Sequence, residues 1–469
     1  PEVTMGSQIT RITARPMIGQ RIPIWRPHKV VLAPNSNERC DAGGEVLAEY
    51  LPQNVLRFLK VYQVAPYLLK DSLLKKITNR FYRSSVLDVK SIFDNPRKKE
   101  KARIQQEKLI NMFVSDYHID LSQYKRPEHG WKDRNQFFIR DLSDDAIATR
   151  RSHFEGEDLN VRVLSPADCR LMLIEDMSQE GAGSPSAIWV KGRGFSIGKL
   201  IGVDTTCRML MGKSESALLD SEMDVFNAVK MELARLAVDF EDCSMAIFRL
   251  APQDYHHFHS PVRGRIKMRI PIPGAVYSVN PLAVASSVDV FGENVRVVDV
   301  IETAAGPEVI MVHVGATIIN GIRFEGPAVS TSPCPPGDFP QEMHPFDPYG
   351  YFCYGGSTNL LLFKKGTVQF NQNLVCMLHQ PQTFKEEIVS PESCKQLTSV
   401  EAQLRALPPG EEHDEQRASL EQERQSLMRE AREREYKFTY DKKSPVGAFR
   451  VEVLVQVGMP IGTLIPEHS

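Results

Sequence analysis

The sequence lacks most of the features that would assign it to a specialised class of protein. Its eight cysteines include no Cys-x-x-Cys pair and are too dilute in 469 residues for a disulfide scaffold, which favours a reducing compartment. No apolar run approaches the roughly 20 residues that a membrane-spanning helix needs. Lys and Arg number 57 against 59 Asp and Glu, and this balance gives no reason to expect nucleic acid as a partner.

What the sequence does contain is enough apolar residues for a sizeable core. Hydrophobic residues make up 42% of the chain, which is sufficient for one large or two medium domains. The first residue is Pro1 and not Met, so a targeting segment could have been removed or omitted, and none is visible.

The order of sequence patterns predicts an α+β fold: a helical N-terminal region followed by a mostly antiparallel β core, with a charged helical insertion near the C-terminus. Residues 1–53 are expected to be irregular, with short extended pieces such as HKVVLA, and residues 54–133 to be helical. Residues 134–469 are expected to form the core. It combines a helix at 221–240 with strands at 244–252, 294–303 and 308–317.

The predicted helical region is basic. Between Arg57 and Lys108 there are 14 Lys or Arg against five Asp or Glu, on a stretch with apolar residues at helical spacing. Such a helix suits an anionic phospholipid membrane surface. An ordinary solvated helix packed on the core explains the pattern equally well.

The insertion at 384–440 is dense in charge and carries only a thin stripe of Leu420, Leu427 and Ala431. A solvated helix is the simpler interpretation, and a partner-binding coiled coil is the alternative. Strand patterning returns in FRVEVLVQVGMPIG, which indicates that the segment interrupts the core.

Two short stretches carry the candidate chemistry. CYGGST at 353–358 lies between extended runs, and taken alone it predicts a hairpin turn. DYHHFH at 254–259 puts His257 and His259 on one side of an extended segment and His256 on the other. The histidines suit zinc poorly because no Cys or carboxylate pair accompanies them at ligand spacing. Asp168, His259 and Ser357 would also suit a charge relay, although GGSTN lacks the second glycine of a GxSxG turn.

Several ordered motifs together resemble the phosphatidylserine decarboxylase family of pyruvoyl-dependent enzymes. They are NQFFIRDL at 135–142, WVKGRGFSIGKLIG at 189–202, LAPQDYHHFHSPV at 250–262, NPLAV, VGAT, YGGST and the terminal VEVLVQVGMPIG. The GGST tetrad is more similar to the eukaryotic endomembrane subfamily than to the mitochondrial or bacterial one, where LGST is usual.

The resemblance implies that the chain cuts itself between Gly356 and Ser357. Ser357 would attack the preceding carbonyl, with His259 as its base and Asp168 as the orienting partner of His259. Elimination and hydrolysis would then turn Ser357 into a pyruvoyl group, the self-derived cofactor. The products would be an upstream chain, 1–356, and a downstream chain, 357–469, which stay associated.

The same resemblance implies decarboxylation of phosphatidylserine to phosphatidylethanolamine and CO2, with His256 as the acid that protonates the carbanion. His257 is interpreted as non-catalytic, and no metal is implied. The enzyme would be peripheral on an intracellular membrane of the endomembrane system and otherwise cytoplasmic, and a homodimer is a further implication.

Three alternatives stay open on the sequence. A pyruvoyl-dependent decarboxylase of a free aromatic amino acid would keep the same maturation residues. A serine hydrolase would use Asp168, His259 and Ser357 without self-cleavage. An unprocessed scaffold would use the charged insertion as its partner site. Two departures from the family pattern, Cys169 and Asn320-Gly321, leave every named catalytic residue in place.

Overall fold

The computed structural model describes a core, made of eight stretches of the chain, and several short outlying pieces. The core covers 119–179, 196–203, 220–280, 289–316, 321–325, 342–353, 357–379 and 451–466. The outlying pieces include 5–6, 9–10, 29–32, 46–48, 104, 106–111, 113–114, 284, 383–387, 414–430 and 432–437. Most of the basic region predicted to be helical therefore lies outside the described residues, as does Gly356.

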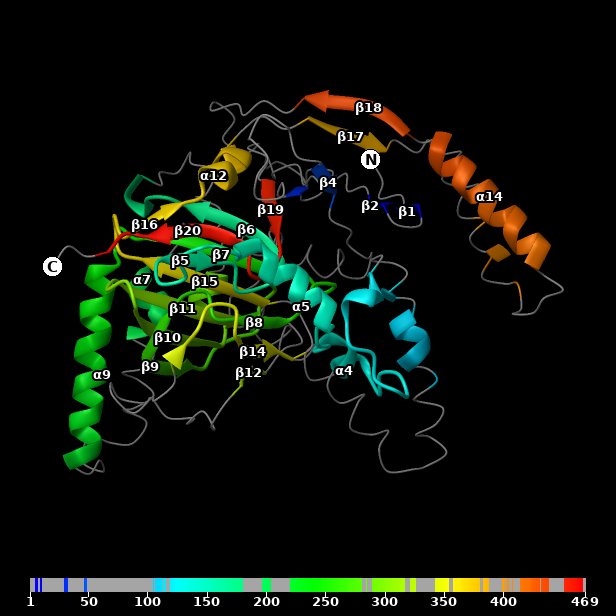
Figure 1. Ribbon diagram of the computed structural model, residues 1–469. Helices are drawn as coiled ribbons and strands as arrows, with labels where there is room; N and C mark the ends of the chain where they lie inside the picture. Colours follow the sequence, from blue (N-terminus) through cyan, green and yellow to red (C-terminus); the bar gives the residue numbers. More distant parts are fainter. Residues whose placement is uncertain are drawn as a thin grey trace, which may run out of the picture.

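A ten-stranded sheet forms the centre of the molecule (Figure 1). Every described pairing in it is antiparallel except that of β19 with β3. The predicted mostly antiparallel core is therefore confirmed. In spatial order its strands are β13 (Glu342–Met343), β9 (Gly264–Ile272), β10 (Arg296–Thr303), β11 (Glu308–Gly315), β15 (Ser357–Phe363), β7 (Ser244–Leu250), β6 (Cys169–Ile174), β19 (Val451–Val455), β3 (Lys29–Leu32) and β4 (Val46–Ala48).

Helices cover one face of this sheet. They are α7 (Ile197–Ile201), α9 (Asp220–Asp239) and α11 (Val290–Glu293). The apolar residues of α9 recur at helical spacing, so Val229, Leu233 and Leu236 share one side and join a core cluster with the sheet residues Ile247 and Leu360. The predicted helix at 221–240 is thereby confirmed.

Two small sheets and a helix cover the other face. One sheet contains β12 (Ile322–Phe324), β14 (Pro348–Phe352) and β8 (His257–His259). The second contains β16 (Val368–Phe370), β20 (Pro460–Leu464) and β5 (Arg162–Leu164), and it lies near α12 (Gln372–His379). Because both faces of the large sheet are covered, β7 and β15 are buried along their whole length, which explains their continuous apolar runs.

The strands that flank CYGGST belong to different sheets. β14 pairs with β8 and β12, whereas β15 pairs with β11 and β7. The hairpin interpretation of this stretch is therefore wrong, because the chain passes here from the small sheet to the large one.

The remaining described elements lie around this core. They are β1 (Met5–Gly6), β2 (Ile9–Thr10), η1 (Leu121–Gln123), α4 (Arg134–Phe138), α5 (Asp144–Arg151), η2 (Ser152–Phe154), η3 (Met177–Gln179), β17 (Thr383–Glu387), α14 (Asp414–Glu430) and β18 (Arg432–Lys437). Within the charged insertion, β17 pairs with β18 and α14 is helical as predicted. After it, β19 pairs with β6 and β20 with β5, so the strand patterning near the C-terminus is also confirmed.

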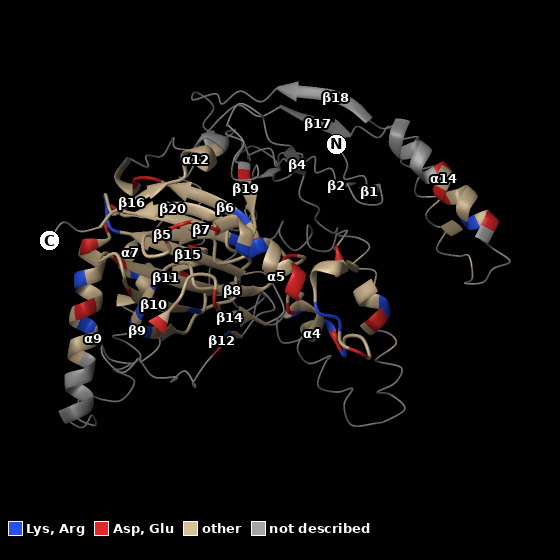
Figure 2. Ribbon diagram, viewed as in Figure 1, with Lys and Arg blue, Asp and Glu red and all other residues tan. Residues whose placement is uncertain are grey.

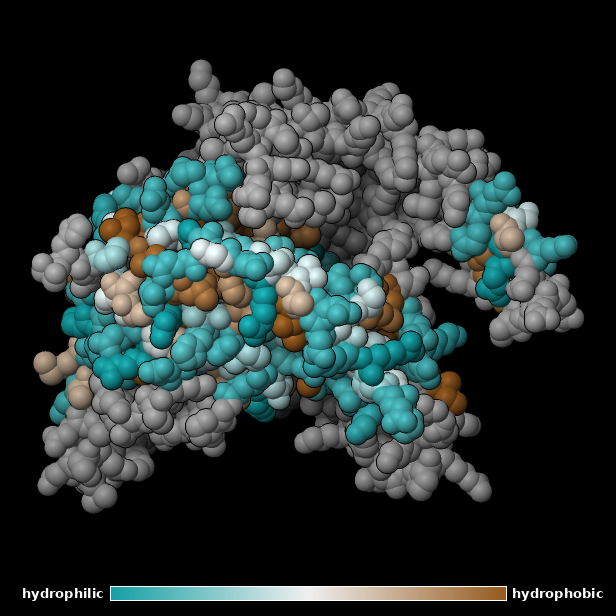
Figure 3. All heavy atoms as spheres, viewed as in Figure 1, coloured by the Kyte–Doolittle hydropathy of each residue, from teal (hydrophilic) through white to brown (hydrophobic). Residues whose placement is uncertain are grey.

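The described surface is mainly polar. Figure 2 shows acidic and basic residues mixed along α9, while the central strands are mostly uncharged. In Figure 3 hydrophilic residues dominate the visible described surface, with apolar patches between them. None of the described helices combines the length and apolar character needed to cross a lipid bilayer.

Candidate active site

Ser357 is the first residue of the central strand β15. It pairs with Leu250 at the end of β7 on one side and with Gly315 at the end of β11 on the other. Its side chain is fully buried, and its Oγ has no hydrogen-bond partner in the part of the chain that the structure describes. A buried hydroxyl without a partner is costly, so this serine is placed for chemistry or ligand contact more than for stability.

Two segments bring His256 toward the end of the central strands where Ser357 begins β15. The chain leaves β7 at Leu250, directly beside Ser357, and reaches His256 six residues later. The carbonyl of His256 accepts a hydrogen bond from the amide of Phe352, five residues before Ser357 (2.9 Å). The tertiary structure thus gathers residues about 100 positions apart in the sequence.

The imidazole of His256 is held in one tautomer. Its Nδ1 donates to the carbonyl of Asp254 (2.8 Å), so in the neutral ring Nε2 carries the lone pair. Nε2 is buried, and no described residue forms a hydrogen bond with it. Burial lowers the pKa of His256 well below its usual value, which keeps the ring neutral at pH 7.

The FFIR motif builds the wall behind this histidine. Phe138 packs against the His256 ring with centroids 3.6 Å apart. Arg140 donates to the carbonyls of Gln253 (2.7 Å) and Asp254 (3.2 Å), just ahead of the histidine. The motif was recognised from the sequence, but this supporting role was not predicted.

His259 has both ring nitrogens engaged. Nδ1 donates to the carbonyl of Phe346 (2.6 Å), and Nε2 accepts from the hydroxyl of Tyr255 (3.1 Å). Phe346 has a positive φ of 72°, which is unusual for a non-glycine residue and turns its carbonyl toward the histidine. Burial lowers the pKa of His259 to about 4, although Asp168 acts in the opposite direction.

Among the described residues, no hydrogen bond joins Asp168 to His259. The carboxylate of Asp168 accepts from Arg150 (2.6 Å from Nη2 to Oδ2) and from the amide of Val457 (2.8 Å). The Phe346 carbonyl binds Nδ1 of His259 in this structure, and the orienting role of Asp168 implied by the resemblance stays a prediction. The carboxylate affects His259 through its charge.

His257 has only structural contacts. Its Nε2 lies 3.0 Å from the carbonyl of Ile139, and its ring stacks parallel to Tyr255 at 5.0 Å. Its Nδ1 lies 3.5 Å from a carboxylate oxygen of Glu325. These contacts hold β8 in place.

Sequence reasoning missed a buried polar chain that ends near Ser357. His313 on β11 links Asn359 on β15 to Asp299 on β10, with ring-nitrogen distances of 2.9 and 3.3 Å. Burial acts to raise the pKa of Asp299, but Arg269 and His313 lower it, so this carboxylate is ionised. A signal was available, because His313 interrupts the apolar run VIMVHV and Asn359 directly precedes the apolar run LLLF.

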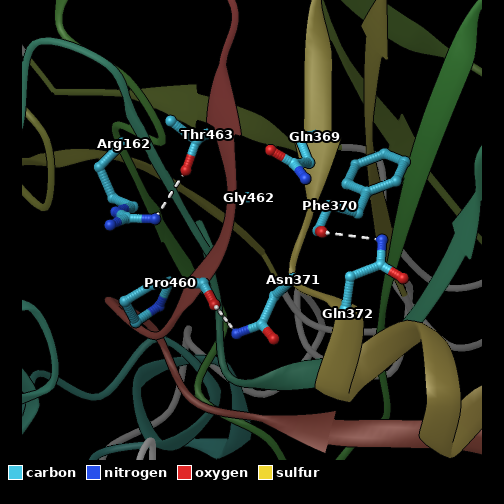
Figure 4. A pocket seen from close by; sticks show the side chains of 8 residues that line it. All are labelled: Arg162, Gln369, Phe370, Asn371, Gln372, Pro460, Gly462 and Thr463. Carbon is cyan, nitrogen blue, oxygen red and sulfur yellow. Dashed lines mark hydrogen bonds between the residues drawn. The ribbon is translucent and has the colours of Figure 1, made fainter.

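Two pockets on the described surface lie away from the candidate catalytic residues. One, of about 190 Å³, is lined by residues of β5, β16 and β20 and by the start of α12 (Figure 4). Arg162 donates to Thr463 there, and Asn371 donates to the Pro460 carbonyl. The other is formed within 127–136. Asp168, His256, His259 and Ser357 line neither of these two pockets.

Comparison with known protein families identifies this arrangement. The family model for phosphatidylserine decarboxylase matches residues 134–380, just over half of the chain. The chain belongs to the phosphatidylserine decarboxylase family. The matched range contains Asp168, His256, His259, Gly356 and Ser357, while β19 and β20 add to the same sheets from beyond it.

Relatives with this family name occur in eukaryotes and bacteria. The chain is 33% identical over 269 residues to phosphatidylserine decarboxylase proenzyme 2 of Oryza sativa, covering 57% of this chain and 35% of that protein. It is 30% identical to the proenzyme of Chlamydia trachomatis, covering 57% and 71%. It is 28% identical to that of Fusobacterium nucleatum, covering 71% and 88%.

The chain spans only a fraction of the eukaryotic relatives that it matches. It covers 35% of the rice protein, 22% of the Komagataella phaffii protein and 19% of the Saccharomyces cerevisiae protein.

Proposed function

We propose that this chain is a self-processing decarboxylase that converts phosphatidylserine to phosphatidylethanolamine and CO2. The observation that carries the proposal is the buried, unpartnered hydroxyl of Ser357 at the start of β15, directly after a Gly-Gly pair. The names of the relatives support it, because each is called a proenzyme of this decarboxylase. Ser357 would therefore be a reactive group whose product is the cofactor.

Maturation takes place in three steps: an N-to-O acyl shift, an elimination and a hydrolysis. Ser357 Oγ attacks the carbonyl carbon of Gly356, its proton passes to a base, and the Gly356–Ser357 C–N bond breaks to leave an ester and a free amine. Loss of the Ser357 α-proton expels the Gly356 carboxylate and leaves dehydroalanine. Water then replaces the nitrogen, releasing ammonia and a pyruvoyl end. The upstream chain, 1–356, and the downstream chain, 357–469, both supply strands to the ten-stranded sheet, which explains why they would stay together.

His259 is proposed as the base, and the Tyr255 hydroxyl already contacts its Nε2. Nε2 of His259 already accepts the Tyr255 hydroxyl, so the serine proton reaches the ring through that hydroxyl or after it rotates away. Asp168, paired with Arg150, would stabilise the imidazolium that results through its charge. Asp168 is thus a positioning and electrostatic residue in this proposal.

His256 is proposed to move the proton during turnover. When present, the pyruvoyl ketone supplies an acceptor for the electrons released as CO2 leaves the substrate. The site fits such a group because Ser357 Oγ and His256 Nε2 are both buried without partners. Neutral His256 would take a proton from the substrate ammonium at Nε2. It would return that proton to the carbon that has lost CO2.

The pH dependence of self-cleavage tests the role of His259. Because burial lowers the pKa of this histidine to about 4, the ring stays neutral, and able to act as base, down to that pH. We expect the cleavage rate of freshly translated precursor to be nearly equal at pH 5 and pH 7 and to fall below about pH 4. A rate that halves near pH 6.5 would indicate a solvated histidine and contradict the assignment.

The substrate is tested by comparing two classes of amine. We expect CO2 release from phosphatidylserine in liposomes and at least a hundredfold less from free tryptophan, tyrosine or phenylalanine. Activity only on the free amino acids would support a soluble amino acid decarboxylase. Labelling of an uncut chain by a fluorophosphonate would instead support a serine hydrolase.

Membrane association is part of the same proposal. The basic stretch from Arg57 to Lys108 is proposed to bind anionic lipid at an endomembrane surface, with the core on the cytoplasmic side, and these residues lie largely outside the described ones. A homodimer is retained as a proposal from the family. Both are tested by flotation with liposomes and by the mass of the complex in solution.

A further inference from the structure

A buried polar chain runs across three strands behind the candidate site. His313 on β11 lies directly opposite Asn359 on β15, and its Nδ1 is 2.9 Å from Asn359 Oδ1. On its other side, Nε2 of His313 is 3.3 Å from Asp299 Oδ2 on β10. All three residues are completely buried within the large sheet. Such a chain costs desolvation and is kept only where its orientation matters.

The far end of this chain is rigidly anchored. Arg269 on β9 donates from Nε to Asp299 Oδ1 (2.6 Å) and from Nη2 to Oδ2 (2.9 Å). Tyr349 on β14 also donates to Asp299. Phe258 packs on the His313 ring, with centroids 4.3 Å apart. The anchor therefore fixes His313, and His313 fixes the Asn359 amide.

The Asn359 amide forms the end of this polar chain that is nearest to Ser357. With Oδ1 of Asn359 held by His313, Nδ2 is buried and has no hydrogen-bond partner among the described residues. A buried donor in this condition is costly unless another state supplies an acceptor. Nothing else in the described fold explains why this strand position carries an amide.

The Asn359 amide lies on the same side of the sheet as Ser357. Residues i and i+2 of a strand share a face and are about 7 Å apart, so Asn359 lies next to Ser357 along β15. Gly315, which pairs with Ser357 on β11, adds no side chain between them. Thr358 faces the opposite side, where the helices pack.

We propose that Asn359 binds the substrate, its side-chain NH2 donating to the carboxylate α to the reacting amine. This inference rests on the proposed function, because it assumes that the substrate amine reacts at the group formed from Ser357. An amide donor suits an anionic oxygen, and the lipid-linked serine head group and a free amino acid both carry that carboxylate. The contact orients the group that leaves as CO2, and His313 is a positioning residue that acts through Asn359.

Binding to an unreactive form of the mature protein tests this proposal without relying on turnover. Borohydride reduction of the cleaved protein would convert the ketone to an alcohol, and calorimetry would then give the Kd for dihexanoyl phosphatidylserine. Asn359→Leu should weaken this binding by about tenfold or more, as expected for a lost hydrogen bond to a charged group. Binding of dihexanoyl phosphatidylethanolamine, which lacks the carboxylate, should change less than twofold.

Two further variants sharpen the result. Asn359→Asp keeps an acceptor for His313 but opposes one carboxylate with another, so the serine lipid should bind at least as weakly as in Asn359→Leu. Leu361→Met lies on the same strand and face, changes packing without removing a donor, and should leave both Kd values unaltered.

The outcomes separate this inference from the proposed function. If the unaltered protein is not cut, the proposed function fails. If it is cut and active but the Asn359 variants bind the serine lipid normally, or lose both lipids equally, only the role of Asn359 is overturned. If both variants remain uncut while Leu361→Met is cut, Asn359 serves maturation, which also overturns the proposal.

Discussion

Ser357→Ala is expected to leave one uncut chain of 52.9 kDa, where the unaltered protein gives a chain of residues 1–356 and a chain of residues 357–469. Alanine has no oxygen to attack the Gly356 carbonyl, so neither the ester nor the pyruvoyl group can form. Decarboxylase activity should fall below detection. Intact-mass spectrometry and a blocked N-terminus on the smaller chain are the measurements.

Ser244→Ala is the matched control for this experiment. Ser244 is also a buried serine, at the far end of the neighbouring strand β7, where it donates to the Glu175 carbonyl (2.6 Å). This variant should be cut normally, with a loss of about 1 kcal/mol of stability. An active, uncut form of the unaltered protein would refute self-processing at this bond.

His256→Gln and His259→Gln are expected to fail at different stages. His256→Gln should be cut, because this histidine serves turnover, but its kcat should fall by about 10²- to 10⁴-fold without the proton carrier at Nε2. His259→Gln should remain uncut, because the base for maturation is gone. The two fragments and single-turnover CO2 release are measured for each variant.

His257→Gln provides the control for both. Its side chain contacts the Ile139 carbonyl and stacks on Tyr255, so the substitution should affect stability more than either reaction. If His256→Gln were uncut and His259→Gln were cut but inactive, the assigned roles would be exchanged. Normal cleavage and turnover in both variants would remove the histidines from the mechanism.

The sequence was informative about individual residues and less informative about contacts between them. Ordered motifs identified His256, His259 and Ser357, and periodicity predicted α9, β7, β10 and β11. The motif around Phe138 and Arg140 was visible, yet its packing on His256 and its bonds to the 253–254 carbonyls depend on a fold that joins positions more than 100 residues apart. Such contacts leave no trace in local patterning.

Asp168 is a second case in which the sequence indicated a residue but not the partner that it contacts. The resemblance predicted a carboxylate that orients His259, and in the structure this carboxylate accepts from Arg150 and from the amide of Val457, in the turn between β19 and β20. Residue type identified Asp168 as a candidate, but which partner it meets depends on how α5, β6 and the chain after β19 converge. His313 and Asn359 were visible as polar interruptions, and only strand register placed them opposite each other.

The amino-acid order alone determined the family, the strands and helices of the core and the residues able to carry the chemistry, because local periodicity and short motifs depend on neighbours in the chain. The three-dimensional fold decided that β14 and β15 enter different sheets, that the Phe346 carbonyl orients His259, and that an unsatisfied amide lies beside Ser357. These outcomes depend on long-range packing and on the desolvation of polar groups, and both arise only when distant segments are brought together.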